Sequence, residues 1–244
     1  MPRRRRAGDP FPPPESATPD GIVAIGALPH PELLKIAYRQ GIFPWPHEGL
    51  PLLWFSPDPR FVLVPEEAHL HQSLKKTLRR GQYTVTFDTA FEDVMRGCQE
   101  AYRPGQYGTW ITSDIIEGYT ALHAEGVAHS VEAWRGDELV GGLYGVSFGR
   151  VFFGESMFAR ATDASKTAFA TLLANLIAWG FDLVDCQSYT DHLSRFGAVE
   201  WPRRRFLDTL ARALEHETRE GPWTVEVPPE EAARVIAEAR KEPR

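Results

Sequence analysis

The sequence of 244 residues contains only two cysteines, Cys98 and Cys186, and no long hydrophobic run. Two cysteines so far apart do not make a disulfide framework or a zinc knuckle, so we expect a reducing compartment. No stretch approaches the roughly 18 consecutive apolar residues of a membrane span, and no apolar segment follows the basic N-terminus as in a secretory signal. These absences predict a cytoplasmic protein without membrane association.

Positive charge is also scarce, because 27 Lys and Arg stand against 33 Asp and Glu, a net charge of -6. The chain as a whole does not attract polyanions, so contact with nucleic acid requires a local basic patch. Two runs lack interleaved acids, namely Lys75, Lys76, Arg79 and Arg80 in one and 203–205 in the other. Such runs are usually solvated faces, but on an acidic chain they are also typical of phosphate contacts.

Three familiar kinds of site are absent or incomplete. No glycine-rich phosphate loop precedes the helix predicted at 163–180, where an acetyl-CoA-dependent enzyme requires one. No two histidines have the i, i+4 spacing of a helical metal site, so we expect no bound metal. The run 145–149 matches the G-x-S-x-G motif of hydrolases, and Asp185 and His192 follow it. A strand instead of a helix is predicted after Ser147, so we do not expect a serine nucleophile.

Strand and helix periodicities alternate through most of the chain. Between residues 60 and 222 they predict an α+β domain whose mixed or antiparallel sheet is flanked by helices. A small N-terminal α+β domain is predicted at 20–59, where the proline-rich aromatic segment 41–60 is expected to be an ordered loop without regular elements. The composition of residues 1–19 predicts a disordered or extended arm, and that of residues 223–244 predicts a charged tail.

Polar side chains interrupt two of the apolar strands near their C-terminal ends. They are Glu155 in FFGESMF, and Asp185 and Gln187 in LVDCQ. Asp185 and Gln187 are two residues apart, so their side chains lie on one face of the strand. Ordinary strand-end polar residues give the same pattern, but a buried carboxylate requires a partner. These three residues are therefore the candidate polar site.

Short segments along the chain form a more specific pattern than any single motif. They are GIFPW (41–45), SPDPR (56–60), GTWIT (108–112), AHS (128–130), DELVGG (137–142), YGV (144–146), GESMF (154–158), ASKTA (164–168), DCQ (185–187), FGA (196–198) and PRR (202–204). In order and spacing they resemble the bacterial leucyl/phenylalanyl-tRNA–protein transferases over about residues 9–215. The expectations that follow are what this resemblance implies.

The resemblance implies an aminoacyltransferase. It would transfer Leu or Phe from aminoacyl-tRNA to the α-amino group of proteins that begin with Arg or Lys, and the new N-terminal residue would be a bacterial N-end-rule degradation signal. Donation of Met stays open. The implied fold is an acetyltransferase-like (GNAT) catalytic domain after a small N-terminal domain, and the enzyme is expected to be a cytoplasmic monomer. Aminolysis of an ester is downhill, so neither ATP nor a metal is expected.

The resemblance also implies roles for individual polar and aromatic residues. Asp185 and Gln187 match the catalytic positions, either as a proton relay or by orienting the attacking amine, and proton transfer through the terminal ribose hydroxyl of the tRNA stays open. Glu155 matches the position that binds the acceptor's N-terminal Arg or Lys through charge-assisted hydrogen bonds. Trp45 and Trp110 match the tryptophans that stack on the 3′-terminal adenosine, although a packing role for Trp45 is the alternative.

The remaining expectations concern the two substrate surfaces. The aminoacyl side chain is expected in an apolar pocket lined by Leu143, Phe152, Met157, Phe169, Leu172 and Val184. The tRNA phosphates are expected on Lys75, Lys76, Arg79 and Arg80. Leu143 and Phe169 depart from a familiar Met and Leu, which leaves the balance among Leu, Phe and Met donors open.

Three other functions fit parts of the pattern. They are a related transferase that builds peptidoglycan cross-bridges, a tRNA-binding module without catalysis, and an acetyl-CoA-dependent acetyltransferase. The eleven segments favour the protein transferase over the first. The intact Glu155, Asp185 and Gln187 argue against the second, and the missing glycine loop argues against the third.

Overall fold

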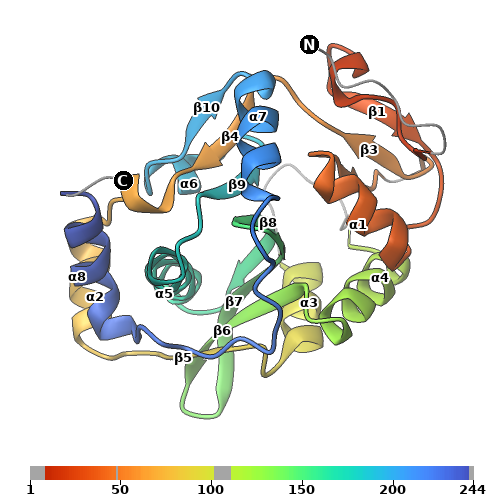
Figure 1. Ribbon diagram of the computed structural model, residues 1–244. Helices are drawn as coiled ribbons and strands as arrows, with labels where there is room; N and C mark the ends of the chain where they lie inside the picture. Colours follow the sequence, from red (N-terminus) through yellow and green to blue (C-terminus); the bar gives the residue numbers. More distant parts are fainter. Residues whose placement is uncertain (1–8, 48, 102–110, 242–244) are drawn as a thin grey trace.

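Two β-sheets organise the chain (Figure 1). The computed structural model describes residues 9–47, 49–101 and 111–241. The smaller sheet has three antiparallel strands in the order β1 (Ile22–Ile25), β3 (Leu53–Phe55) and β2 (Phe43–Trp45). Helix α1 (Pro31–Arg39) connects β1 to β2, and its first turn begins at the N-cap His30.

The aromatic segment 41–60 contains regular structure, so the prediction of a loop without elements was wrong. Strands β2 and β3 pair within it, and the next strand begins at Arg60. Pro44 lies in the middle of β2, which is tolerated because β2 is three residues long and lies at the edge of its sheet. The aromatic side chains supply the burial that holds these short strands, since Phe43, Trp54 and Phe55 are all buried.

The larger sheet is mixed. Its order is β10 (Val199–Trp201), β4 (Arg60–Leu63), β9 (Leu183–Gln187), β8 (Val151–Ala159), β7 (Glu138–Phe148), β6 (Ala128–Arg135) and β5 (Thr84–Phe87). Neighbouring strands are antiparallel except β8 and β9, which are parallel and are connected by helix α5 (Ala164–Ala178). The predicted α+β fold with a mixed sheet flanked by helices is confirmed.

Helices cover both faces of the larger sheet (Figure 1). One apolar cluster includes α1, α3 (Phe91–Glu100) and α4 (Ser113–Ala124), and the other includes α5, α2 (Gln72–Arg79) and α8 (Pro229–Ala239). The structure also contains α6 (Asp191–Ser194), α7 (Arg203–Ala213) and short 3-10 helices at Pro14–Ser16 and Pro65–Glu67. In the described ranges, no helix has the length and apolar character to cross a bilayer.

Both ends of the described chain pack against the fold, contrary to the predicted arm and tail. Phe11 is 3% exposed and lies edge-on to the Trp54 ring, with the centroids 4.8 Å apart. At the other end Trp223 is 2% exposed, and α8 packs against α5 and α2 through Ala232 and Ile236. The charged composition of 223–244 concealed the i, i+4 apolar spacing of this helix.

Candidate active site

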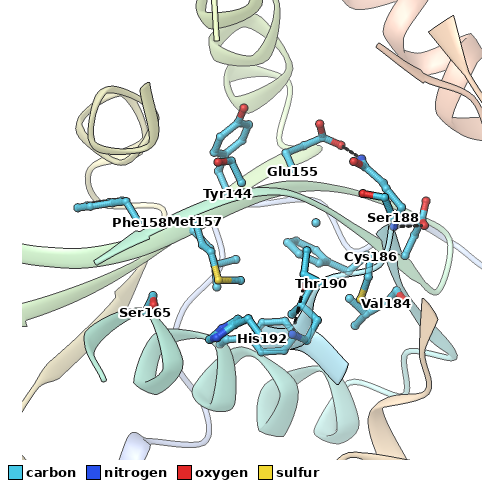
Figure 2. A pocket seen from close by; sticks show the side chains of 18 of the residues that line it. Tyr144, Glu155, Met157, Phe158, Ser165, Val184, Cys186, Ser188, Thr190 and His192 are labelled. Carbon is cyan, nitrogen blue, oxygen red and sulfur yellow. Dashed lines mark hydrogen bonds between the residues drawn. The ribbon is translucent and has the colours of Figure 1, made fainter. Parts of the chain in front are cut away.

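A cavity of about 760 Å³ opens where strands β8 and β9 separate (Figure 2). Their parallel pairing ends at Phe153 opposite Asp185, whereas β8 continues to Ala159 and β9 to Gln187. The residues after the last pair line the cavity from both strands. Further walls come from β2, the start of α5, and α6.

A β-bulge at Glu155 divides the cavity into two halves. Gly145 pairs with Gly154 and Tyr144 with Ser156, so Glu155 is the extra residue between them. In a regular strand Phe153 and Met157 would lie on the same face, but they belong to opposite apolar clusters. Figure 2 shows Glu155 and Met157 pointing in different directions, with Met157 toward α5. The bulge therefore gives the cavity a polar half and an apolar half.

The polar half is centred on the Glu155 carboxylate. Its Oε1 accepts hydrogen bonds from the Tyr38 hydroxyl at 2.7 Å and from the Gln187 Nε2 at 2.6 Å. Its Oε2 accepts one from the Tyr119 hydroxyl at 3.1 Å, and the hydroxyls of Tyr38 and Tyr119 bond each other. Burial raises the pKa of the Glu155 carboxyl from 4.5 to about 7, while these hydrogen bonds oppose the rise. Burial also raises the pKa of both tyrosines, which keeps them protonated as donors.

Asp185 is fully buried and is paired with Arg60. Arg60 Nε lies 2.8 Å from Asp185 Oδ1 and Arg60 Nη2 lies 2.5 Å from Oδ2, a bidentate arrangement. Asp185 Oδ1 also accepts a hydrogen bond from the backbone N–H of Gln187 at 2.9 Å. In this geometry Asp185 holds the Gln187 backbone, and Glu155 holds the Gln187 side-chain amide.

The apolar half contains five of the six residues expected for the aminoacyl side chain. Leu172 is fully buried in α5 but does not line the cavity. Cys186, His192 and Leu193, which were not expected in this pocket, also line the cavity. The expected residues that do line it are Leu143, Phe152, Met157, Phe169 and Val184.

Of the two tryptophans expected at the adenosine, Trp45 lines the cavity beside Pro44 and Pro46. Its ring is edge-on to Phe55, with centroids 5.5 Å apart, so it also packs in the small sheet. Trp110 lies outside the described residues.

The two basic runs differ in how their side chains are used. In α2 and its C-cap residue Arg80, the side chains of Lys76, Arg79 and Arg80 are exposed and Lys75 is half-buried. None of these four forms an ion pair with another described residue. In α7, by contrast, Arg203 donates to the Ser56 carbonyl at 2.6 Å, and the Arg205 guanidinium lies 3.6 Å from the Trp201 ring centroid. The α2 run therefore remains available to a ligand, while two residues of the α7 run are occupied by internal contacts.

The hydrolase motif places Ser147 away from the cavity. Its Oγ lies 3.4 Å from His129 Nε2, and His129 Nδ1 lies 2.9 Å from Asp88 Oδ2. All three side chains are buried, and none lines the cavity. The His129 ring stacks on Trp223, so this cluster secures the C-terminal segment to the sheet. Across the described ranges, no group of three or more His, Cys, Asp and Glu side chains is arranged to hold a metal ion.

Comparison with known proteins gives the family. A family model described as leucyl/phenylalanyl-tRNA protein transferase matches residues 62–211, and one described as the N-terminal domain of that transferase matches residues 29–58. The chain belongs to the leucyl/phenylalanyl-tRNA–protein transferase family. A relative of that name from Myxococcus xanthus is 59% identical over 88% of this chain and 92% of its own length. Others from Anaeromyxobacter sp. and Stutzerimonas stutzeri are 57% and 54% identical over 87% and 84% of this chain and 91% of their own lengths.

Three residues of the site, Arg60, Tyr38 and Tyr119, were not predicted from the sequence. Arg60 was assigned to the end of a loop, although a cation beginning the strand RFVL could have suggested a buried pair. Tyr38 and Tyr119 occupy apolar positions of amphipathic helices, which is ordinary core spacing. Only the fold brings them to Glu155.

Proposed function

We propose that the chain transfers Leu or Phe from aminoacyl-tRNA to the α-amino group of proteins with N-terminal Arg or Lys. We further propose that the product is an N-end-rule degradation signal, and that the enzyme acts as a monomer in the cytoplasm without ATP or a metal. The observation that carries the proposal is the divided cavity, whose apolar half suits an aminoacyl side chain and whose polar half suits a basic N-terminus. The relatives named for this reaction support it.

The donor would bind in the apolar half. Its Leu or Phe side chain would lie among Leu143, Met157 and Phe169, where a β-branched side chain fits poorly by shape. The terminal adenosine would stack on Trp45, and on Trp110 by family resemblance. The phosphates of the tRNA would lie on the exposed basic face of α2. Thr77 of α2 donates to Asp163 at 3.2 Å, which places α2 beside the start of α5, a wall of the cavity.

The acceptor would bind in the polar half. Its Arg or Lys side chain would pair with the ionised Glu155 carboxylate. Because Gln187 Nε2 already donates to Glu155, its Oε1 remains to accept a hydrogen bond from the acceptor's α-amine. That nitrogen attacks the ester carbonyl, the bond from the carbonyl carbon to the ribose oxygen breaks, and a proton from the amine ends on that oxygen.

We propose the acetyltransferase-like (GNAT) fold for the larger sheet and a separate small N-terminal domain for the β1–β3–β2 sheet. The antiparallel β6–β7–β8 meander, the α5 crossover and the parting of β8 from β9 support this assignment. A coenzyme A donor fits poorly. Asp163 occupies the N-terminus of α5, where its Oδ1 pairs with Lys166 at 2.7 Å, so a carboxylate stands where a pyrophosphate would bind.

A transfer assay tests the proposal. Purified protein is mixed with radiolabelled leucyl-, phenylalanyl- or isoleucyl-tRNA and with peptides that begin with Arg, Lys or Ala, without ATP. We expect Leu and Phe to appear on the Arg and Lys peptides, and little transfer of Ile or to Ala. Tight binding of tRNA without any transfer would support a binding module and contradict the proposal.

A further inference from the structure

Arg60 is a buried arginine fixed by the two parts of the fold that meet behind the cavity. Its side chain is 1% exposed. The guanidinium carbon lies 4.7 Å from the Phe43 ring centroid and 4.5 Å from that of Phe206. Phe43 belongs to the small sheet and Phe206 to α7, so rings from two separate elements hold the guanidinium.

The pairing with Arg60 uses both oxygens of Asp185. Oδ1 accepts from Arg60 Nε and from the Gln187 backbone N–H, and Oδ2 accepts from Arg60 Nη2. A carboxylate so engaged is poorly placed to take a proton from an incoming amine. Its hydrogen bonds instead suit it to hold the neighbouring Gln187 in a fixed orientation.

That neighbour, Gln187, has an unusual backbone. Its φ of 64° lies in the left-handed region, which is costly for a residue with a Cβ and persists only where its surroundings hold it. The hydrogen bond from its N–H to Asp185 holds this conformation at the end of β9. The same conformation directs its side-chain amide to Glu155.

We propose that Arg60 is a positioning residue of the transferase: through Asp185 it holds Gln187 in the conformation that aims the Gln187 Oε1 at the acceptor's α-amine. Asp185 then positions Gln187 and does not accept the proton. The inference rests on the proposed transfer reaction, and it adds a residue that contacts neither substrate.

The first test replaces Arg60 by Lys, which keeps the charge but makes neither the bidentate pair nor the planar stack. We expect kcat with an Arg peptide to fall about 100-fold, because misplacing a reacting group by about 1 Å costs that much. The KM for leucyl-tRNA should change little, since Arg60 does not line the cavity. An unchanged kcat overturns the proposal.

Arg219→Lys is the matched control. Arg219 also lies over a ring, 4.3 Å from the Trp179 centroid, and also pairs with a carboxylate, Glu226, at 2.5 Å. It does not line the cavity, so this variant should retain wild-type kcat.

The pH profile separates positioning from proton transfer. The loss in kcat/KM for Arg60→Lys and Asp185→Asn should be the same factor from about pH 8 to 9.5, where Glu155 is ionised, because misplacement does not depend on deprotonation of the amine. If Asp185 were the proton acceptor, the loss for Asp185→Asn would shrink as rising pH supplies neutral amine. A shrinking loss overturns the proposal.

A structural measurement removes the dependence on activity. In protein labelled with 15N-glutamine, the Gln187 backbone amide signal should shift and lose protection from hydrogen exchange in Arg60→Lys, while it stays unchanged in Arg219→Lys. An unmoved Gln187 signal overturns the proposal even if wild-type protein transfers nothing. Conversely, if wild-type protein is inactive but the Gln187 signal shifts in Arg60→Lys as expected, the proposed reaction is contradicted while the role of Arg60 in holding Gln187 stands.

Discussion

At the scale of single residues, Glu155 determines how the cavity is divided. As the extra residue of the bulge it lies opposite no residue of β7, so its side chain reaches Tyr38 and Tyr119 while Met157 reaches the α5 side. Sequence alternation predicts the same face for residues 153, 155 and 157. Gly154 lies beside the bulge, and a glycine within a strand often marks one, but it does not show which residue is extra or which faces the side chains then take, so alternation alone did not predict the division of the site.

The selection of basic acceptors should depend on pH through Glu155. Its carboxyl pKa is about 7, so the ionised form that pairs with Arg predominates above pH 7. We expect the ratio of kcat/KM for a peptide beginning with Arg to that for one beginning with neutral citrulline to fall as pH drops through about 7. The α-amine of the two peptides titrates alike and cancels in the ratio.

The Glu155→Gln variant should have a low ratio that does not change with pH. Asp191 is an exposed carboxylate beside the cavity, so Asp191→Asn is the control and should keep the wild-type pH dependence of the ratio.

The stability of the fold should also depend on the ionisation of Glu155. Its pKa is higher in the folded protein than the ordinary value of 4.5, so the protonated carboxyl stabilises the fold relative to the ionised one. This stabilisation is complete below about pH 4.5 and is lost as the pH rises to about 7. Glu155→Gln should therefore have a higher Tm than wild type at pH 8, which separates lost selection from lost folding. If the ratio in Glu155→Gln still fell as the pH dropped through 7, a group other than Glu155 would select the basic residue.

At the scale of elements, α2 combines a buried apolar stripe with an exposed basic face. Leu74 and Leu78 are buried, whereas Lys76, Arg79 and Arg80 are exposed. The i, i+4 spacing of the leucines gives the helix one buried side, which leaves the basic run noted in the sequence on the exposed side.

Charge reversal on α2 tests whether this face binds tRNA. Changing Lys76, Arg79 and Arg80 together to Glu should raise the KM for leucyl-tRNA at least tenfold and flatten its dependence on salt, because fewer counterions are released. The control reverses Arg96, Arg135 and Arg234, whose side chains are 58%, 55% and 58% exposed and whose surface ion pairs stabilise the fold little. Both variants change the net charge equally. Equal effects on KM would show that only net charge matters and that tRNA does not lie on α2.

Strongly periodic elements were the most predictable. Helix α5 and strands β8 and β9 follow the helix expected at 163–180 and the strands expected in FFGESMF and LVDCQ, because continuous apolar runs specify them. The strands β2 and β3 were missed because prolines surround them, and their stability comes from buried aromatic contacts instead of local propensity. Helix α8 was missed because its short apolar stripe lies among charges and requires α5 as a partner.

At the scale of the whole molecule, the site brings together segments that are far apart in the chain. Tyr38 is 117 residues from Glu155, and Arg60 is 125 residues from Asp185. Family resemblance indicated Glu155, Asp185 and Gln187, but it did not indicate the tyrosines or the arginine that hold them. Such partners depend on sheet order and helix packing, which local patterns do not determine.

The two halves of the cavity are expected to select the two substrates separately. The most direct measurement compares two ratios of kcat/KM in wild type, Phe169→Leu and Glu155→Gln. The donor ratio is the value for phenylalanyl-tRNA over that for leucyl-tRNA. The acceptor ratio is the value for the peptide beginning with Arg over that for the peptide beginning with citrulline. Phe169 lines the apolar half, so Phe169→Leu should raise the donor ratio about tenfold and leave the acceptor ratio unchanged. Glu155→Gln should lower the acceptor ratio and leave the donor ratio unchanged. If either variant changed both ratios together, the cavity would not be divided as described.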